Sequence, residues 1–543
     1  MKKLLFIFLF LTSYTTSVFA QALSVNTTRF VGGDSSCGYS IAKYSIHTRD
    51  GGILFTGFTD CFAGGGNIPP SPPDTIGATV ANVLIGKLDS NMNVSWVKVY
   101  GGNEEDIGMS AVQMPDGGYA VLAQTYSNDR DVSGNHGVYL GDLWLVRLDS
   151  LGNLVWQKCY GSPYDEQATS IALAPDGGFI MLGISNGSGD EVSTHYGTEF
   201  NYNWFVVKAD SLGNMQWSKT IGGTGDGVDG GESSTGSIFI ANDGYYLVSS
   251  TNSIDYDCTD TFWHPNVNTG YDYYMFKLDT AGNILWDRSY GGLGGEVAYN
   301  AIWDDRDSSI VINGLTTGGN GYMVTGYNGG IADFWVVKTD KNGVLKWEKC
   351  LGGPNDDEGV SICTAPFGYM AYGSTNPGSI GHEDAWLFSL DTLGNEITNK
   401  QFGGANYDYP ASVFLFQNGY AAVGYGVSDS FTEGINIGHS SGLIEDVFIS
   451  YLNYWPLSIQ NIATHNMDMT LYPNPSTAII RIILPDQVGN ITILNCVGES
   501  IYTGNAKQNE TIDINTAGWA SGLYIAKWQG DDGTVLTKKF IKN

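Results

Sequence analysis

The chain has 543 residues, and its 26 Lys and Arg against 56 Asp and Glu give a formal net charge of −30. Only 15% of its residues are charged, whereas 73 are Gly and 13% are aromatic. This composition excludes a helical bundle or coiled coil. A hydrophobic content of 42% also excludes a disordered chain. The acidity argues against a nucleic-acid partner, because a polyanion is repelled by an acidic protein. We expect a secreted all-β protein with Gly-rich turns.

Residues 1–20 have the pattern of a secretory signal peptide. Lys2 and Lys3 precede the apolar run 4–11, and Ala20 supplies the small residue at the cleavage position. No other segment approaches the roughly 18 apolar residues that a membrane-spanning helix needs, so we predict no transmembrane segment. The protein is therefore expected to be secreted or to lie on the outer cell surface after removal of the signal peptide.

The seven Cys residues form no C-x-x-C pair, which argues against a zinc-ribbon or redox motif. Cys37 and Cys61 are a candidate disulfide in an oxidising compartment. Cys159 and Cys350 occupy equivalent positions of a sequence repeat, so we expect them to stay apart.

A repeat of 50 to 70 residues covers most of the chain. Its clearest element is a short β-branched and aromatic segment that is apolar on both faces and reads as a covered strand. This element recurs at 82–89, 142–149, 203–210, 272–279, 333–340, 384–391 and 446–453. A lone Lys or Arg near its end is expected to extend its charged group to water.

A constant frame surrounds this element. A turn and a strand ending in Trp follow it, as in 149–156, and a Gly pair such as Gly101-Gly102 comes next. A strand that opens with small residues then leads to an Asp-Gly turn, which is a hairpin signal. The frame predicts four antiparallel strands per repeat, and we interpret the Trp residues as core that packs between repeats.

Seven four-stranded repeats predict a seven-bladed β-propeller over residues 21–455. The last repeat lacks a fourth strand, whereas residues 26–33 resemble an orphan fourth strand with its Gly pair. We therefore expect the N-terminal strand to complete the last blade and close the ring, which removes exposed sheet edges.

The variable loops of such a ring share one face, where binding sites usually lie. Four His residues lie in these loops and are expected to be ordinary loop residues: His136, His195, His382 and His439. Acidic residues also gather there: Glu104, Glu105, Asp106, Asp165, Glu166, Asp226, Glu232, Asp356, Asp357 and Glu358.

One acidic loop on this face is a candidate calcium site. Asp129, Asp131 and Ser133, followed by Gly134, match the first half of an EF-hand loop, whose alternating oxygen ligands suit a hard cation. The twelfth position is Leu140 instead of Glu, so a solvated acidic loop is the competing interpretation. Calcium is the one cofactor that the sequence suggests.

No catalytic residue is predicted. Ser185 lies in a G-x-S-x-G pattern, but a nucleophile elbow needs a following helix and a polar loop follows here. The carboxylates are numerous enough for a glycosidase or lyase pair, yet that chemistry needs two of them at a set separation.

After a polar linker at 456–468, residues 469–543 read as short alternating strands of a small β-sandwich. The charge is uneven, because the propeller holds 18 basic and 49 acidic residues. Three motifs mark the module, at 471–475, 522–524 and 538–543. Their positions are Tyr472, Pro473, Asn474, Pro475, Gly522, Leu523, Tyr524, Lys538 and Lys539.

These motifs resemble the C-terminal sorting domain of type IX secretion cargo in Bacteroidota. The resemblance covers about 75 residues and implies that this module is recognised by the type IX machinery at the outer membrane. The propeller repeats look like those carried by many such cargo proteins, which supports the architecture more than an activity.

The sequence favours a secreted or surface-attached binding or adhesion protein for a glycan, the matrix or a protein. Two alternatives stay open: a polysaccharide-active hydrolase or lyase that uses the carboxylates of the loop face, and a structural surface component.

Overall fold

The computed structural model describes residues 22–33, 37–61, 64–70, 80–198, 200–225, 235–241, 243–260, 270–318, 323–376, 383–404, 406–427, 435–437, 445–455, 469–472, 475–484, 488–495, 499–507, 510–530 and 535–543. In these residues all regular secondary structure is β-strand. The chain divides into two compact units, residues 1–456 and 457–543. The expected signal peptide and the expected linker lie outside the described residues.

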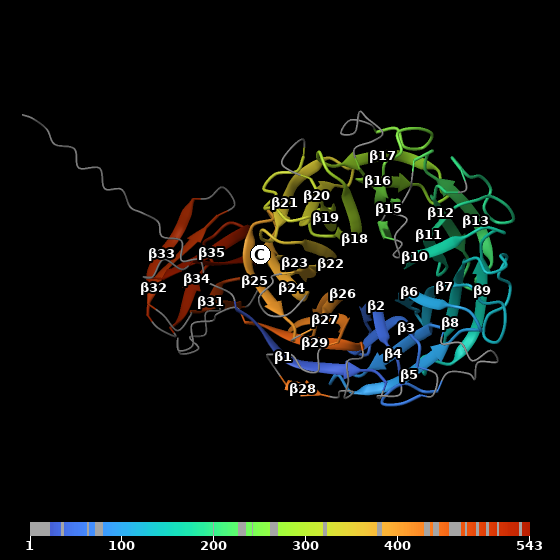
Figure 1. The fold of residues 1–543 in the computed structure, drawn as a ribbon. Coiled ribbons are helices and arrows are strands. Elements are labelled where there is room, and N and C mark those ends of the chain that lie inside the picture. Colours follow the sequence, from blue (N-terminus) through green and yellow to red (C-terminus); the bar gives the residue numbers. More distant parts are fainter. Residues whose placement is uncertain are drawn as a thin grey trace, which may run out of the picture. The chain divides into compact units, whose positions relative to one another are not determined.

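Six sheets of the first unit have four antiparallel strands each, paired in chain order (Figure 1). They are β2 (Ser40–His47), β3 (Ile53–Thr59), β4 (Asn82–Leu88) and β5 (Val94–Tyr100); β6 (Asp106–Gln113), β7 (Tyr119–Thr125), β8 (Asp142–Leu148) and β9 (Leu154–Tyr160); β10 (Glu166–Leu173), β11 (Phe179–Ser185), β12 (Asn203–Ala209) and β13 (Met215–Ile221); β14 (Ser237–Ala241), β15 (Gly244–Thr251), β16 (Asp272–Leu278) and β17 (Ile284–Tyr290); β18 (Glu296–Asp304), β19 (Ser309–Thr316), β20 (Asp333–Asp340) and β21 (Leu345–Leu351); β22 (Asp357–Ala365), β23 (Gly368–Thr375), β24 (Asp384–Asp391) and β25 (Glu396–Phe402).

A further sheet joins the two ends of the first unit. It contains β26 (Asp408–Phe416), β27 (Gly419–Gly426), β29 (Asp446–Trp455) and β1 (Ala22–Val31), with the short β28 (Ile435–Ile437) at its edge. β1 pairs antiparallel with β29 from Ala22 opposite Trp455 to Val31 opposite Val447. The first strand of the chain is therefore the fourth strand of the last sheet (Figure 1).

The sheets stand around a common centre with their first strands innermost (Figure 1). Each first strand lies beside the next, in the order β2, β6, β10, β14, β18, β22, β26, and β26 lies beside β2. Small polar side chains link these strands: Ser170 accepts a hydrogen bond from the Ile238 amide at 3.3 Å, and Ser361 from the Val413 amide at 3.2 Å. Ser412 and Ser45 share a hydrogen bond between the last sheet and the first. The first unit is a β-propeller, and its sheets are numbered as blades in chain order, from the sheet that begins with β2 to the sheet that begins with β26.

The third strands form the core of the blades, as the repeat pattern predicts. Residues of β8, β12 and β20 are buried almost throughout. The predicted packing of the Trp residues is also found, because a Cβ on Gly213 would lie 2.8 Å from the ring of Trp156 on the preceding blade. Gly213 has φ +77°, which suits Gly and allows the turn to rest on that ring.

The basic residue of the third strand differs from expectation. Lys208 does not reach water: its side chain is 3% exposed, and its ammonium donates to Asp176 at 2.7 Å and to the Ala209 carbonyl at 3.0 Å. Asp176 belongs to the Asp-Gly hairpin turn of the same blade. The hairpin Asp provides a fixed carboxylate partner, so the charge is satisfied inside the blade.

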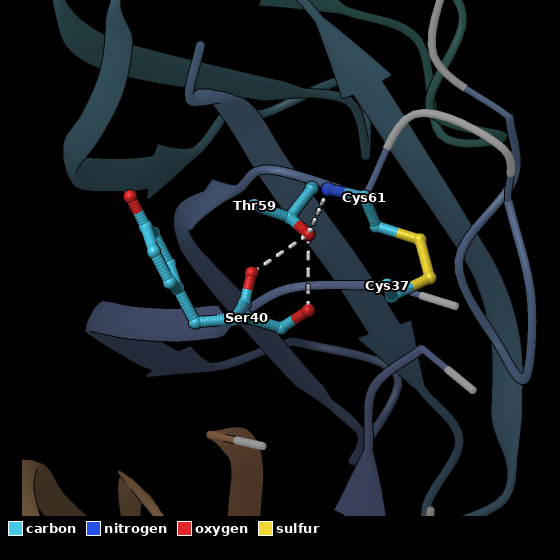
Figure 2. Close-up of a disulfide and its surroundings, with 5 residues drawn as sticks. Cys37, Ser40, Thr59 and Cys61 are labelled. Carbon is cyan, nitrogen blue, oxygen red and sulfur yellow. Dashed lines mark hydrogen bonds between the residues drawn. A yellow bond between two sulfur atoms is a disulfide. The ribbon is translucent and has the colours of Figure 1, made fainter. Parts of the chain in front are cut away.

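Cys37 and Cys61 form a disulfide in the first blade (Figure 2). Thr59 stands beside it, where its hydroxyl accepts from the Cys61 amide at 3.2 Å and shares a hydrogen bond of 3.0 Å with Ser40. The bridge thus ties the segment before β2 to the segment that follows β3. The other Cys residues that the structure describes are free thiols: Cys159, Cys258, Cys350 and Cys363.

The second unit contains two antiparallel sheets around one core. The first holds β30 (Thr470–Tyr472), β31 (Ile479–Ile483) and β34 (Thr511–Asn515); the second holds β32 (Gly489–Leu494), β33 (Ser500–Ala506), β35 (Gly522–Gly530) and β36 (Val535–Lys542). Ile480 and Ile482 of the first sheet and Trp528 of the second are among its buried residues. This arrangement is a small β-sandwich.

Candidate ligand-binding site

The predicted calcium loop lies between β7 and β8, where its oxygens meet protein donors. The Asp129 carboxylate accepts from the Asn103 amide at 2.9 Å, and that of Asp131 accepts from the Gly101 amide at 3.3 Å. Ser133 accepts from the Gln157 side chain at 2.6 Å. These bonds hold the loop against the Gly pair that precedes β6.

The same contact recurs in other blades. Glu191 accepts from the Gly161 amide at 3.1 Å, and Asp257 accepts from the Gly222 amide at 3.2 Å. In the described part of the chain, no group of three or more His, Cys, Asp and Glu is arranged to hold a metal ion. The repetition indicates that these acidic residues fix the loops by hydrogen bonds to backbone amides. Calcium binding at Asp129 and Asp131 stays a prediction.

Ser185, His136 and His195 hold loops in place. Ser185 is buried and donates to Glu166 at 2.5 Å. His136 contacts Asp142 through Nδ1 at 2.6 Å, and this hydrogen bond raises the pKa of the imidazole. His195 contacts the Asn201 carbonyl through Nε2 at 2.8 Å. His382 and His439 lie outside the described residues.

Several acids expected on the loop face are buried between blades instead. Asp106, Glu166 and Asp357 open the first strands of their blades and are fully buried. The carboxylate of each accepts a hydrogen bond from the backbone amide four residues earlier in the chain. Glu166, for example, accepts from the Ser162 amide at 2.7 Å. A Cβ on Gly161 would lie 2.5 Å from both Asp142 and Glu166, which explains the Gly at this position. Asp226 and Glu232 lie outside the described residues.

A cavity of about 530 Å³ occupies the centre of the propeller. Residues of all the first strands line it, from β2, β6, β10, β14, β18, β22 and β26. The size and the convergence of side chains from seven strands are typical of a small-molecule site. This axial cavity is the candidate functional site.

One side of the cavity is acidic and aromatic. We call Glu358, Glu383, Tyr409 and Tyr425 the acid–tyrosine wall; all four line the cavity. The rings of Tyr409 and Tyr425 stack with centroids 5.2 Å apart, and Ser374 donates to Glu383 at 2.6 Å. Glu358 and Tyr409 lie at the starts of β22 and β26, Glu383 directly precedes β24, and Tyr425 lies near the end of β27. Antiparallel pairing places these strand ends at one edge of the sheets, where Tyr409 is opposite Tyr425.

Burial and mutual repulsion shape the ionisation of this wall. Burial raises the pKa of Glu358, and the charges of Glu383 and Asp356 raise it further. Burial also raises the pKa of Glu383, against the hydrogen bond from Ser374. Burial and the Glu383 charge raise the pKa of Tyr409 to about 12, so its hydroxyl stays neutral at physiological pH. The wall can accept hydrogen bonds, stack on a ligand, or hold and release a proton.

In the third blade, the residues at the positions of Glu358 and Glu383 are Gln167 and Tyr202, and they form hydrogen bonds to Asp165. Tyr202 donates to Asp165 at 2.9 Å, and Gln167 donates to Asp165 at 3.2 Å. Asp165 also accepts from the Gly141 amide at 2.9 Å. The acid–tyrosine wall is therefore a property of the sixth and seventh blades and is not common to all repeats.

Sequence reasoning placed Glu358 on the loop face but missed the other three members of the wall. Glu383 immediately precedes Asp384 of a predicted third strand, and Tyr409 immediately follows Asp408. Alignment of the repeats on these aspartates would have shown that both positions face the centre.

The sorting motifs of the second unit converge in space. Leu523 pairs with Ile541 and Tyr524 with Phe540, and the Ser476 amide, next to Pro475, donates to the Ile541 carbonyl at 2.8 Å. Tyr524 is buried, whereas the remaining described motif positions are exposed: Tyr472, Pro475, Gly522, Leu523, Lys538 and Lys539. Pro473 and Asn474 lie outside the described residues.

Comparison with known proteins gives one family match. Residues 470–543 match the secretion system C-terminal sorting domain. No curated protein matches the chain. No helix in the described residues is long and apolar enough to cross a membrane.

Solved structures are similar to the chain at low identity. The β-propeller domain of the Trilobed protease from Pyrococcus furiosus is 8% identical, with a TM-score of 0.40 over 77% of this chain and 94% of that one. A member of the DUF4221 family from Bacteroides vulgatus is 11% identical, with a TM-score of 0.36 over 81% of this chain and 99% of that one. The Neurospora crassa Pan2 WD40 domain is 10% identical, with a TM-score of 0.39 over 80% and 96%.

The sorting domain indicates a type IX secreted protein, located outside the cell or at its surface, that interacts with the type IX machinery.

Proposed function

We propose that this protein is a secreted or cell-surface binding protein whose ligand enters the axial cavity and rests on the acid–tyrosine wall. The observation that carries this proposal is a central cavity of about 530 Å³ with stacked tyrosines and two carboxyls on one side. A rigid propeller that presents such a cavity is suited to recognition without large movement. Adhesion through a glycan, the matrix or a protein is the corresponding biological role.

The proposed chain plan has four parts. Residues 1–20 are the signal peptide, 21–455 a seven-bladed propeller closed by β1, 456–468 a linker, and 469–543 the sorting domain of a Bacteroidota protein. The pairing of β1 with β29 supports closure, and the family match from residue 470 supports the last boundary.

A binding screen tests the proposed function. The purified chain would be applied to arrays of polysaccharides and matrix proteins, with and without calcium. We expect retention on one ligand class and loss of that retention in Tyr425→Ala, because the variant removes one face of the wall. Tyr139→Ala is the control, since Tyr139 is 74% exposed and does not line the cavity. A folded protein that binds nothing on either array would refute the proposal and favour a structural surface role.

Hydrolysis or elimination of a polysaccharide is the second candidate function. Glu358 and Glu383 line the same cavity, and a raised carboxyl pKa is what a general acid requires. Turnover of a bound polysaccharide that is lost in Glu358→Gln or Glu383→Gln, with binding retained, would support it. Binding without turnover would exclude it.

A further inference from the structure

The axial cavity holds two carboxyl groups, Glu358 and Glu383, and one basic residue, Lys43, also lines it. No ion pair among the described residues joins Glu358 or Glu383 to a Lys or Arg. Ser374 supplies a hydrogen bond to Glu383, and no described residue donates to Glu358. Two half-buried carboxylates beside each other repel, so a positive charge placed between them would be stabilised.

Aromatic faces lie beside these carboxyls. Tyr409 and Tyr425 stack on one another and also line the cavity. A cation near a tyrosine face is attracted by the ring, and the attraction is larger where water is excluded. Carboxylates combined with tyrosines therefore favour an organic cation with some apolar surface over a bare metal ion.

The third and fourth blades supply unsatisfied hydroxyl groups to the same cavity. Thr169 and Thr235 line it and are only 7% and 6% exposed. The hydroxyl oxygen of each is buried without a hydrogen-bond partner in the described part of the chain. A buried hydroxyl without a partner is unfavourable, so these groups mark a second place where a polar ligand atom would be satisfied.

The net charge of the propeller also favours a cationic ligand. Its 49 acidic against 18 basic residues create a negative potential that attracts cations and repels anions.

We propose that the axial cavity binds a small organic polycation, an alkyl diamine or triamine, with one ammonium group against Glu358, Glu383 and the tyrosine rings. The other end of the ligand reaches toward Thr169 and Thr235. This proposal deepens the binding function above and rests on it. The volume of the cavity suits a free amine of this size. A lysine side chain of a short peptide carries the same alkylammonium group.

Isothermal titration of the purified full chain with putrescine and spermidine tests the ligand class. We expect saturable binding that weakens with salt, and a loss of affinity of about tenfold in both Glu358→Gln and Glu383→Gln. Affinity should rise between pH 5 and pH 8, because binding needs the ionised carboxylates. Glu396→Gln is the matched control: it removes one charge from the same blade, on the exposed outer strand β25.

Two further arms separate the outcomes. A blocked tripeptide Gly-Lys-Gly that binds while spermidine does not would assign the site to a peptide lysine and overturn the free amine. A neutral oligosaccharide that binds equally to wild type and both Gln variants, but not to Tyr425→Ala, would overturn the cation proposal and leave the binding function intact. Circular dichroism melts establish that each variant is folded. Failure of all three probes and of the arrays would overturn both proposals.

Discussion

At the scale of single residues, the repeats pair a buried basic side chain with the hairpin Asp. Lys87 pairs with Asp50, Arg147 with Asp116 and Lys277 with Asp243, as Lys208 does with Asp176. In the sixth and seventh blades the basic position is Ser389 or Tyr451, and their hairpin turns lack Asp. The basic side chain and its Asp partner are therefore present or absent together. A buried positive charge is tolerated only when a carboxylate pairs with it.

Asp176→Ala should destabilise the propeller by about 2 kcal/mol, because it leaves the Lys208 ammonium buried without its carboxylate. Chemical unfolding followed by tryptophan fluorescence measures this change. The double variant Asp176→Ala, Lys208→Ser reproduces the pattern of the sixth blade and should recover part of the loss. Equal stability of the two variants would contradict the pairing argument.

At the scale of elements, a buried acid opens most of the third strands. Burial, together with the charge of Asp357 on the next blade, raises the pKa of Asp333 to about 6. The Asn328 amide donates to Asp333. In the third blade Asn203 accepts the equivalent bond from Tyr196 at 2.7 Å, so an amide serves the same structural purpose without a charge.

The raised pKa of Asp333 predicts that the stability of the protein depends on pH. Because the fold favours the neutral form of Asp333, its contribution to stability is complete below about pH 4 and is lost as the pH rises through about 6. Asp333→Asn should therefore flatten the decline in stability between about pH 4 and pH 6 and stabilise the protein by about 1 kcal/mol at pH 8.

Thermal melts across this pH range provide the measurement. Asp305→Asn, which removes an exposed charge from the same blade, is the control. A steeper decline in Asp333→Asn than in wild type would show that the carboxylate is favoured in the fold.

At the scale of the whole molecule, the two units have separate tasks. The propeller carries the acidic charge and the cavity, whereas residues 470–543 match the sorting domain and bring its motifs to one end of β35 and β36. Leu523, Lys538 and Lys539 are exposed there. A surface for the secretion machinery needs such accessible residues.

Removal of residues 469–543 should abolish export and leave the propeller inside the cell, because the machinery would have nothing to recognise. Immunoblots of medium, cell surface and periplasm measure the distribution. Lys538→Ala with Lys539→Ala tests the exposed end of the motif, and Lys507→Ala is the control in the same domain. Undiminished export of the truncated chain would refute the role of this domain.

The sequence by itself determined the repeat, the order of strands within each sheet and the C-terminal module. These features depend on local patterns: alternation of apolar residues, Asp-Gly turns and motifs a few residues long. It also indicated that residues 26–33 act as a fourth strand, because the last repeat lacked one.

Only the tertiary structure decided which acids line the axial cavity. Asp106 and Glu166 looked like loop-face acids and are buried between blades, whereas Glu383, Tyr409 and Tyr425 were overlooked and line the cavity. The oxygens of Asp129 and Asp131 looked like metal ligands and meet the amides of Asn103 and Gly101. The physical reason is that these contacts join residues of neighbouring blades or of distant loops, so neither composition nor spacing along one repeat records them.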